Sequence, residues 1–372
     1  MTIQPGQGKR AVHDHRNIEG WRGLASGAVH ADESTGRRVL LVWDFATVPY
    51  TIGELLYLQV RGLILKWLHQ AKRVDVAFIC NPESPARKDQ GLSSYNYHPH
   101  FASLVSVPLV SPNLGNFLLF DSHSEFEKYL SCSAHSYVEI WPTSEDYRSR
   151  KPAYTDSLTI IESFFAEHGW VPHLSCRPVM QDWAQSFFLR TVLPDIPVTV
   201  QLRNNAAMKH GLRRNSKLES WLEFFRYCAG RFPVKFVVIC AWTEVDPRLR
   251  ECPNVVVAKD SHTSLEQDLA LIQSSALFMG GSSGPALMAV FSKLPYLIFN
   301  VHTSYENRSR GTQHVFATSQ QKLVWEPEIS ELLIREFTSS IEKLDTSAWL
   351  DNCTDRLLSG SLEAIQSPFT LR

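Results

Sequence analysis

Residues 274–300, SSALFMGGSSGPALMAVFSKLPYLIFN, constrain the fold more than any other stretch of this chain. The apolar run at 276–279 predicts a short buried strand, and the small residues at 280–284 predict a tight turn. Apolar residues then recur at helical spacing over 287–294, before a second apolar run at 296–300. Strand, turn, helix and strand in this order predict a parallel sheet whose strand ends face a ligand.

The turn GGSSG at 280–284 carries no side chain larger than the hydroxyls of Ser282 and Ser283, so a ligand could approach its backbone closely. Pro285 fits the first position of the following helix, where the missing N–H has no consequence. Exposed amides at a helix start favour an anion such as a phosphate. The alternative is a tight turn that binds nothing.

The length and composition predict a soluble globular protein of two domains. A chain of 372 residues is too long for one ordinary core, and 44% hydrophobic with 20% charged residues is the usual globular balance. Lys plus Arg number 37 against 38 for Asp plus Glu, which gives no support for a nucleic-acid partner. No stretch resembles a signal peptide or reaches the length of a membrane span, so we expect a cytoplasmic protein; peripheral membrane contact stays open.

The seven cysteines are scattered and form no CxxC pair, which favours reduced thiols and argues against a zinc site. Residues 1–36 are polar, and we expect a flexible leader there. Strands at 39–43 and 74–80 flank a helix that begins near Ile52, the βαβ unit that opens a doubly wound domain. The polar stretch 81–100 predicts a long loop.

Further strands are expected at 117–120 and 137–141, and helices near 124–130, 156–167 and 181–191 complete a first domain at 37–192. A Pro-flanked linker at 193–197 follows, and the alternation then restarts with strands at 198–202, 234–242 and 254–258 and a helix at 219–228. The second domain is placed at 193–335, and a helical segment at 336–372.

Thr263 and Glu266 have the spacing of a capping box before the next helix. The predicted fold class is α/β, with two Rossmann-like domains facing a cleft. In each half, ligands should bind beyond the carboxyl ends of the strands.

Several residues at those strand ends could carry chemistry. Arg203 ends the strand in VTVQLRNN, where a guanidinium could hold a phosphate, and Lys209 follows in the same loop. Asp44 ends the first strand of the chain, Glu54 lies in the first turn of the next helix, and His98 lies in the long polar loop. Asp44 is the first candidate for a general base, Glu54 the second, and His98 could contact the acceptor or act as the base; the alternatives are a loop cap, an ordinary helix-start acid and an ordinary loop residue.

Two segments, VTVQLRNN at 198–205 and FMGGSSGPALMAVFSKLPYLIFN at 278–300, resemble the donor-binding domain of GT-B glycosyltransferases. The resemblance is to the fucosyltransferase-like group and to bacterial surface-polysaccharide transferases, which carry a strand ending in H-x-R and a later Gly-Ser-Ser turn. It implies that Arg203 contacts a nucleotide diphosphate and that Gly281, Ser282, Ser283 and Gly284 lie against the donor. Gln201 stands at the histidine position and Asn204 replaces a second arginine of some fucosyltransferases, so the resemblance does not extend to the donor sugar.

The resemblance therefore implies sugar transfer from a nucleotide sugar to a glycan or glycoconjugate, with inversion. It also implies that the second domain binds the donor and that the first domain, at 37–192, binds the acceptor. No Asp-x-Asp occurs in the chain, which favours a reaction without a metal or other cofactor, in which basic residues and amides stabilise the leaving diphosphate. A sugar-nucleotide epimerase or a non-catalytic sugar-nucleotide-binding protein would use the same donor domain.

A serine hydrolase is the remaining alternative, because GGSSG also matches G-x-S-x-G with Ser282 as nucleophile. That family requires the order serine, acid, histidine. After Ser282, the histidines are His302 and His314, and only Glu306 could serve as the acid before the second. Eight residues separate Glu306 from His314, which leaves little chain for a further strand between them.

Overall fold

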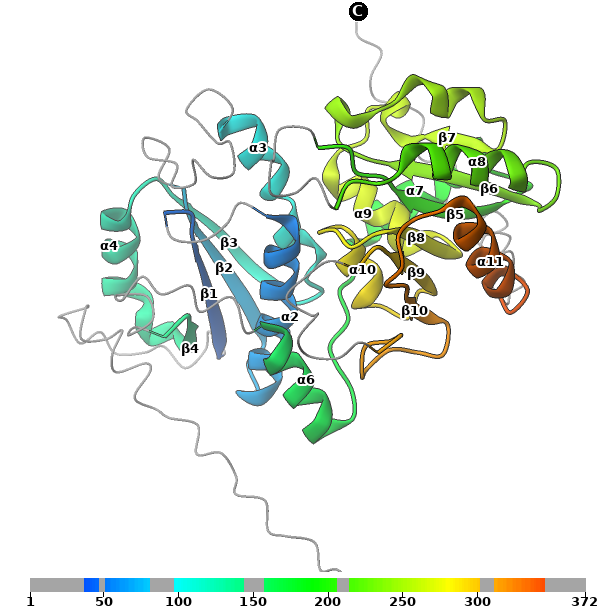
Figure 1. Cartoon of the computed structure of the whole chain (residues 1–372). Helices are drawn as coiled ribbons and strands as arrows, with labels where there is room; N and C mark the ends of the chain where they lie inside the picture. The colour runs from blue at the N-terminus through cyan, green and yellow to red at the C-terminus, as the bar shows by residue number, and fades with distance from the viewer. Residues whose placement is uncertain are drawn as a thin grey trace, which may run out of the picture.

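A computed structural model describes residues 37–46, 51–80, 97–143, 157–205, 214–301 and 311–344. These residues form two parallel sheets, each covered by helices on both faces (Figure 1). The predicted α/β class with two Rossmann-like domains is confirmed.

The first sheet has four parallel strands in the order β3-β2-β1-β4. Alternate residues of its central strand face opposite cores: Val39 and Leu41 join the core under one helix, and Leu40 and Val42 the core under another. The first helix, α2, covers the face that looks toward the second sheet, and α4 covers the outer face (Figure 1). The elements are β1 (Arg38–Asp44), α2 (Ile52–Leu68), β2 (Arg73–Ile79), α3 (Tyr97–Leu104), β3 (Leu114–Phe120), α4 (His123–Ser133), β4 (Tyr137–Trp141) and α6 (Ser157–His168).

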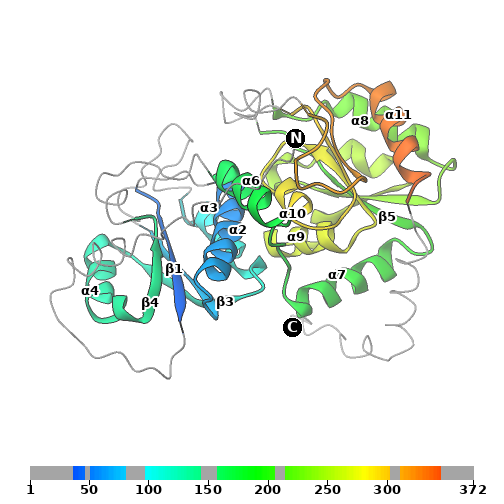
Figure 2. The ribbon, with the colours of Figure 1, turned by 90° about the horizontal axis from the view of Figure 1, so that it is seen from below.

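The second sheet has six parallel strands in the order β10-β9-β8-β5-β6-β7. Helices α8 and α11 cover one face, while α7, α9 and α10 cover the other (Figure 2). The elements are α7 (Pro178–Thr191), β5 (Ile196–Gln201), α8 (Leu218–Cys228), β6 (Val234–Ile239), β7 (Val255–Val257), α9 (Leu265–Ser274), β8 (Leu277–Gly281), α10 (Ala286–Val290), β9 (Tyr296–Phe299), β10 (Gln321–Leu323) and α11 (Ser330–Ile341).

Each sheet has a point at which the strand order reverses direction. In the first sheet, β1 lies between β2 and β4; in the second, β5 lies between β6 and β8. Ligands of open parallel sheets bind beyond the carboxyl ends of the strands at such points, because the loops there diverge to opposite faces. The chain that follows β5 and the turn that follows β8 therefore meet where a ligand is expected.

The chain passes from one sheet to the other between α6 and α7. The Leu174 N–H donates to the Phe291 carbonyl, and the next N–H, of Ser175, donates to the carbonyl of Val110 near the first sheet. Helix α7 then packs against α9. The domain boundary at 192/193 stays a prediction, and the helix before it packs with the second sheet.

The capping box lies one residue beyond its predicted position. Ser264 caps α9, its hydroxyl accepting the Gln267 N–H while the Gln267 side chain accepts the Ser264 N–H. Thr263 instead donates to Asp268, and Glu266 pairs with Arg177. The prediction of Thr263 and Glu266 as the box was wrong because two overlapping pairs have the same spacing and tertiary partners select between them.

The six cysteines within the described ranges are free thiols. Among the helices that the structure describes, none combines the length and apolar character required to span a bilayer.

Candidate functional site

The turn after β8 is joined to β5 at the point where the strand order of the second sheet reverses. The Ser283 hydroxyl donates to the Gln201 side-chain oxygen at the end of β5. A Cβ on Gly280 would lie 2.7 Å from the Gln201 carbonyl oxygen, so only glycine permits this strand spacing. Gln201 thus fixes the turn, at the position where the resembling transferases carry histidine.

Gly284 is required by the first domain rather than by a ligand. A Cβ at this position would lie 2.8 Å from the Gly53 nitrogen and 2.9 Å from the Ile52 Cβ. The first turn of α2 therefore sits directly on the turn after β8. At Gly284 the close neighbour of this turn is the backbone of the other domain, and the close approach of a ligand to the rest of the turn stays a prediction.

Arg214 holds the same turn from the second domain. Its Nε and one terminal nitrogen both donate to the Ser282 carbonyl, at 3.0 and 2.7 Å. The Ser282 N–H donates to the Phe299 carbonyl, so the backbone of this serine is fixed on both sides. The predicted donor-binding residues Gly281, Ser282, Ser283 and Gly284 therefore lie in a turn that these hydrogen bonds hold in place.

Two guanidiniums lie close enough to affect one another at this edge. The pKa of Arg214 is lowered by burial first and by the positive charge of Arg203 second, while Glu54 acts in the opposite direction. Burial also lowers the pKa of Arg203, against the pull of the Glu244 carboxylate. Two half-buried cations in this arrangement favour an anion between or beside them, because a bound anion compensates both their mutual repulsion and their desolvation.

Glu244 lies beside Arg203 at the same edge. Its carboxylate accepts the Asn204 N–H at 3.0 Å, which ties the segment after β6 to the segment after β5. The 3-10 helix η7 (Trp242–Glu244) carries this carboxylate.

Glu54 places a carboxyl group from the first domain near Arg214. It lies in the first turn of α2, where its N–H donates to the side chain of the N-cap residue Thr51. Burial raises the pKa of Glu54, and Arg214 opposes that shift. A carboxyl group with a raised pKa accepts a proton more readily near neutral pH than an ordinary glutamate does.

Asp44 has a different environment. It is only 2% exposed, accepts the Ala46 N–H at 2.9 Å and pairs with His123 Nε2 at 3.2 Å. These contacts stabilise the loop after β1 and the start of α4, and burial limits contact with an acceptor. Asp44 stays a predicted base, with geometry less suited to that role than that of Glu54.

Two other predicted residues cannot be placed in the site. His98 falls in α3, and the prediction for its side chain is untested. Lys209 lies outside the described residues.

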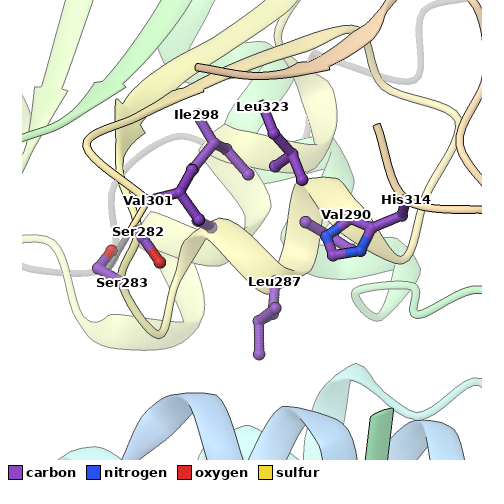
Figure 3. A pocket seen from close by; sticks show the side chains of 9 residues that line it. Ser282, Ser283, Leu287, Val290, Ile298, Val301, His314 and Leu323 are labelled. Atoms are coloured by element: carbon purple, nitrogen blue, oxygen red, sulfur yellow. The ribbon is translucent and has the colours of Figure 1, made fainter. Parts of the chain in front are cut away.

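A small hollow opens beside the two serines (Figure 3). Its cavity volume is about 30 Å³, room for about two water molecules and much less than a nucleotide needs. Its wall is mostly apolar and comes from the turn, α10, β9 and the segment that leads into β10. The lining residues are Ser282, Ser283, Ala286, Leu287, Val290, Ile298, Val301, His314 and Leu323.

His314 and Ser282 lie at opposite sides of this hollow (Figure 3). The His314 ring stacks on Phe316 with centroids 5.1 Å apart, and burial lowers its pKa to about 4. A nucleophilic serine needs its histidine within hydrogen-bond reach. This geometry gives no support to a hydrolase that uses Ser282 and His314.

A buried carboxyl group, that of Glu328, lies against the turn that follows β8. Glu328 is 1% exposed and accepts the Lys217 N–H at 2.8 Å and the Trp221 indole N–H at 3.0 Å through one oxygen. Its other oxygen lies against Gly281 and has no hydrogen-bond partner among the residues that the structure describes. Burial raises the pKa of Glu328, which favours its protonated form.

Arg214, Glu244 and Glu328 were not predicted from the sequence. Each lies in a polar segment outside the regular strands, so no periodic pattern singles it out. Only Glu244 has a position in the sequence that could have indicated its place. It follows β6 closely, and residues that follow a parallel strand lie at the carboxyl edge of the sheet, where ligands bind.

No group of three or more His, Cys, Asp or Glu side chains within the described ranges is placed to hold a metal ion.

Comparison with known proteins gives no match to any family model and no match among curated protein sequences. Solved structures do match. A glycosyl transferase family 9 structure from Veillonella parvula has a TM-score of 0.52 at 12% identity, covering 85% of this chain and 100% of that one. The ADP-heptose lps heptosyltransferase II of E. coli has a TM-score of 0.47 at 9% identity, covering 82% and 99%. The α-1,6-fucosyltransferase NodZ, crystallised with GDP, has a TM-score of 0.29 at 11% identity, covering 71% and 94%.

The first of these matches supports the same two-domain architecture along nearly the whole chain. The chain therefore has the GT-B fold, as the resemblance of its two segments implied.

Proposed function

We propose that this protein is a glycosyltransferase that binds a nucleotide sugar at the carboxyl edge of the second sheet, between β5 and β8. The observation that carries the proposal is the pair of half-buried arginines, Arg203 and Arg214, beside a turn of small residues at the strand-order reversal. Their charge suits the diphosphate of the donor, and the rigid turn limits the reorganisation needed to bind it.

The arginines would also stabilise the leaving group. When the bond between the sugar and the diphosphate breaks, negative charge grows on the diphosphate oxygen. Guanidiniums that are fixed before the reaction stabilise this charge without rearranging. The full sequence has no Asp-x-Asp, which supports a reaction in which these arginines take the role of a metal ion.

Glu54 is the base that we propose for the acceptor hydroxyl. It reaches the site from the first domain, and its raised pKa suits proton transfer near neutral pH. The acceptor hydroxyl would lose its proton to this carboxylate while its oxygen attacks the anomeric carbon from the side opposite the diphosphate. Displacement from the opposite side inverts the anomeric centre. The acceptor itself would be a glycan or glycoconjugate bound by the first domain.

The donor site is tested by thermal shift with ADP-, GDP-, UDP-, dTDP- and CMP-sugars on the wild type, Arg203→Ala and Arg214→Ala. We expect one nucleotide class to raise the melting temperature of the wild type and to lose most of this effect in both variants. Arg248→Ala is the matched control, because this arginine is tied to Glu219 and Asp246 on the surface. A wild type that no nucleotide stabilises would overturn the donor-site proposal.

Turnover distinguishes the remaining functions. Release of the nucleoside diphosphate that rises with added glycan acceptor identifies a transferase. Conversion of the sugar nucleotide without acceptor would identify an epimerase, and binding without any turnover would identify a non-catalytic binding protein.

A further inference from the structure

An exposed aromatic pair lies farther along the strand edge that carries the arginines. Trp242 follows β6 and is 53% exposed, and its ring faces that of His262, with centroids 5.2 Å apart and planes 32° apart. His262 follows β7, the strand next to β6. An indole left half in solvent beside an imidazole offers a flat apolar surface for a third ring.

The pair lies in line with the proposed diphosphate site. The sheet order β8-β5-β6-β7 places the turn, Arg203, Trp242 and His262 on successive strand ends. Neighbouring strands are roughly 5 Å apart, so two steps from β5 to β7 span about 10 Å. The distance from the base to the β-phosphate of an extended nucleoside diphosphate is of the same order.

Glu244 lies between the two ends of this line. It belongs to the same 3-10 helix as Trp242, and it accepts the Asn204 N–H next to Arg203. A carboxylate in this place is suited to accept hydrogen bonds from ribose hydroxyls.

The segment that carries His262 is fixed from below by a buried network. Lys259 Nζ donates to the Thr263 carbonyl at 2.7 Å and to Asp268 at 2.6 Å, and the Thr263 hydroxyl donates to Asp268 at 2.6 Å. These bonds hold Lys259 and Thr263, which lie before and after His262 in the chain, so the backbone that carries the His262 ring is fixed before any ligand arrives.

The backbone of His262 points to the same conclusion. It has φ 56° and ψ 37°, a left-handed conformation that glycine or asparagine adopts more easily. A histidine in this left-handed conformation, with its ring against an exposed tryptophan, suits a ligand-binding role.

We infer that Trp242 and His262 form a stacking platform for the nucleobase of the donor, with Glu244 facing its ribose. This inference rests on the proposed function, since it takes the diphosphate to lie at Arg203 and Arg214. Base–aromatic stacking tolerates any base, so the platform supplies affinity for nucleotides over bare pyrophosphate.

The test measures dissociation constants by calorimetry for ADP, GDP, UDP and inorganic pyrophosphate. The proteins are the wild type, Trp242→Ala, Trp242→Phe and His262→Gly. We expect Trp242→Ala to weaken the preferred nucleotide roughly ten- to hundredfold and to leave pyrophosphate unchanged. Trp242→Phe should keep most of the affinity. His262→Gly relieves the backbone and removes one ring, so it should fold well and bind the nucleotide more weakly.

Tyr227→Ala is the matched control, because it removes another exposed ring of the same domain, on α8. Nucleotide affinity that is unchanged in Trp242→Ala and His262→Gly would overturn the platform and leave the donor site standing. Equal weakening of nucleotide and pyrophosphate would also overturn it, because the substitution would then act through the arginines. A wild type that binds none of the nucleotides would overturn both the platform and the proposed function.

Discussion

At the scale of single residues, Glu54 and Arg214 form the charge interaction that couples the two domains at the proposed site. Burial raises the pKa of Glu54 and the guanidinium of Arg214 lowers it, so removing the guanidinium should raise this pKa further. If Glu54 is the base, kcat/KM falls as pH drops through its pKa. We therefore expect the acidic limb of the pH–rate profile to move to higher pH in Arg214→Met.

The control for this prediction is Arg203→Met, which weakens donor binding but leaves Arg214 beside Glu54. The acidic limb of its pH–rate profile should have the same midpoint pH as that of the wild type. Glu54→Gln should lose roughly 10²–10⁴-fold in rate and show no such limb. An acidic limb that survives in Glu54→Gln would assign the base to another group, with Asp44 the next to test.

Glu328 gives a stability prediction at the same scale. Its truncation to alanine leaves the Lys217 N–H and the Trp221 indole N–H buried without their acceptor. Each unpaired donor costs about 1–3 kcal/mol, so we expect Glu328→Ala to lower the free energy of unfolding by about 2–6 kcal/mol. Urea titration measures this loss. Glu328→Gln keeps an acceptor oxygen, and a loss as large as that of alanine would contradict the explanation.

The pH dependence of that stability has a definite sign. The pKa of Glu328 is raised in the folded state, so the folded protein holds a proton that the unfolded chain has released. The free energy of unfolding should therefore fall as pH rises from the ordinary glutamate range through the raised pKa. Glu328→Gln cannot titrate, and its stability should depend less on pH than that of the wild type.

The sequence predicted Arg203 and the small-residue turn as donor-binding residues because both follow apolar strands that are visible as patterns. It could not locate Arg214, which lies in a polar connection and reaches the site only by its contact with the Ser282 carbonyl. It also ranked Asp44 above Glu54. Strand-end position favours Asp44, and only the folded structure shows that Asp44 is already paired with His123 and that Glu54 lies near Arg214.

At the scale of elements, the contact between α2 and the turn after β8 depends on Gly284. A Cβ there would lie within 2.9 Å of Gly53 and Ile52, so the first turn of α2 would have to move. We expect Gly284→Ala to lower the free energy of unfolding by about 1–3 kcal/mol. It should also reduce turnover by more than tenfold, because Glu54 lies in the displaced turn. Denaturant titration and steady-state kinetics measure the two effects.

Gly281→Ala is the matched stability control on the same turn. Its Cβ would meet the Glu328 oxygen at 3.4 Å, an ordinary contact. Equal destabilisation by both substitutions would mean that the turn itself, and not its contact with α2, limits stability.

Most elements were predictable because burial on both faces makes the parallel strands continuous apolar runs, and their helices carry apolar residues at helical spacing. The exceptions lack such a signal. Strand β10 has only three residues, and α3 lies in a stretch whose composition predicts a loop. The capping box of α9 lies one residue after the predicted one. Asp268 binds Thr263 and Arg177 binds Glu266, so these two residues are not available for capping, and the sequence does not reveal these contacts.

At the scale of the whole molecule, the two domains share one hydrophobic core. The cluster that contains Val39 and Leu41 of the first sheet also contains Val237 and Phe278 of the second. Tyr57 on α2 and Phe291 after α10 meet within it, with ring centroids 5.5 Å apart. The successive bonds of Leu174 and Ser175 to opposite domains reinforce this connection. Sequence patterns predict each sheet from its own residues, but a core shared between sheets has no local signal.

This shared core predicts a single cooperative unfolding transition for the wild type, with equal calorimetric and van't Hoff enthalpies. Phe291→Ala should lower the free energy of unfolding by about 3–5 kcal/mol, and it removes the ring that joins the domains. We expect its transition to broaden or split, so that tryptophan fluorescence and far-UV circular dichroism no longer coincide. Phe126→Ala is the matched control, because Phe126 belongs to α4 and its fully buried ring packs on the outer face of the first sheet. This variant should lose comparable stability but unfold in one step. One coincident transition in Phe291→Ala would mean that the remaining contacts suffice to couple the domains.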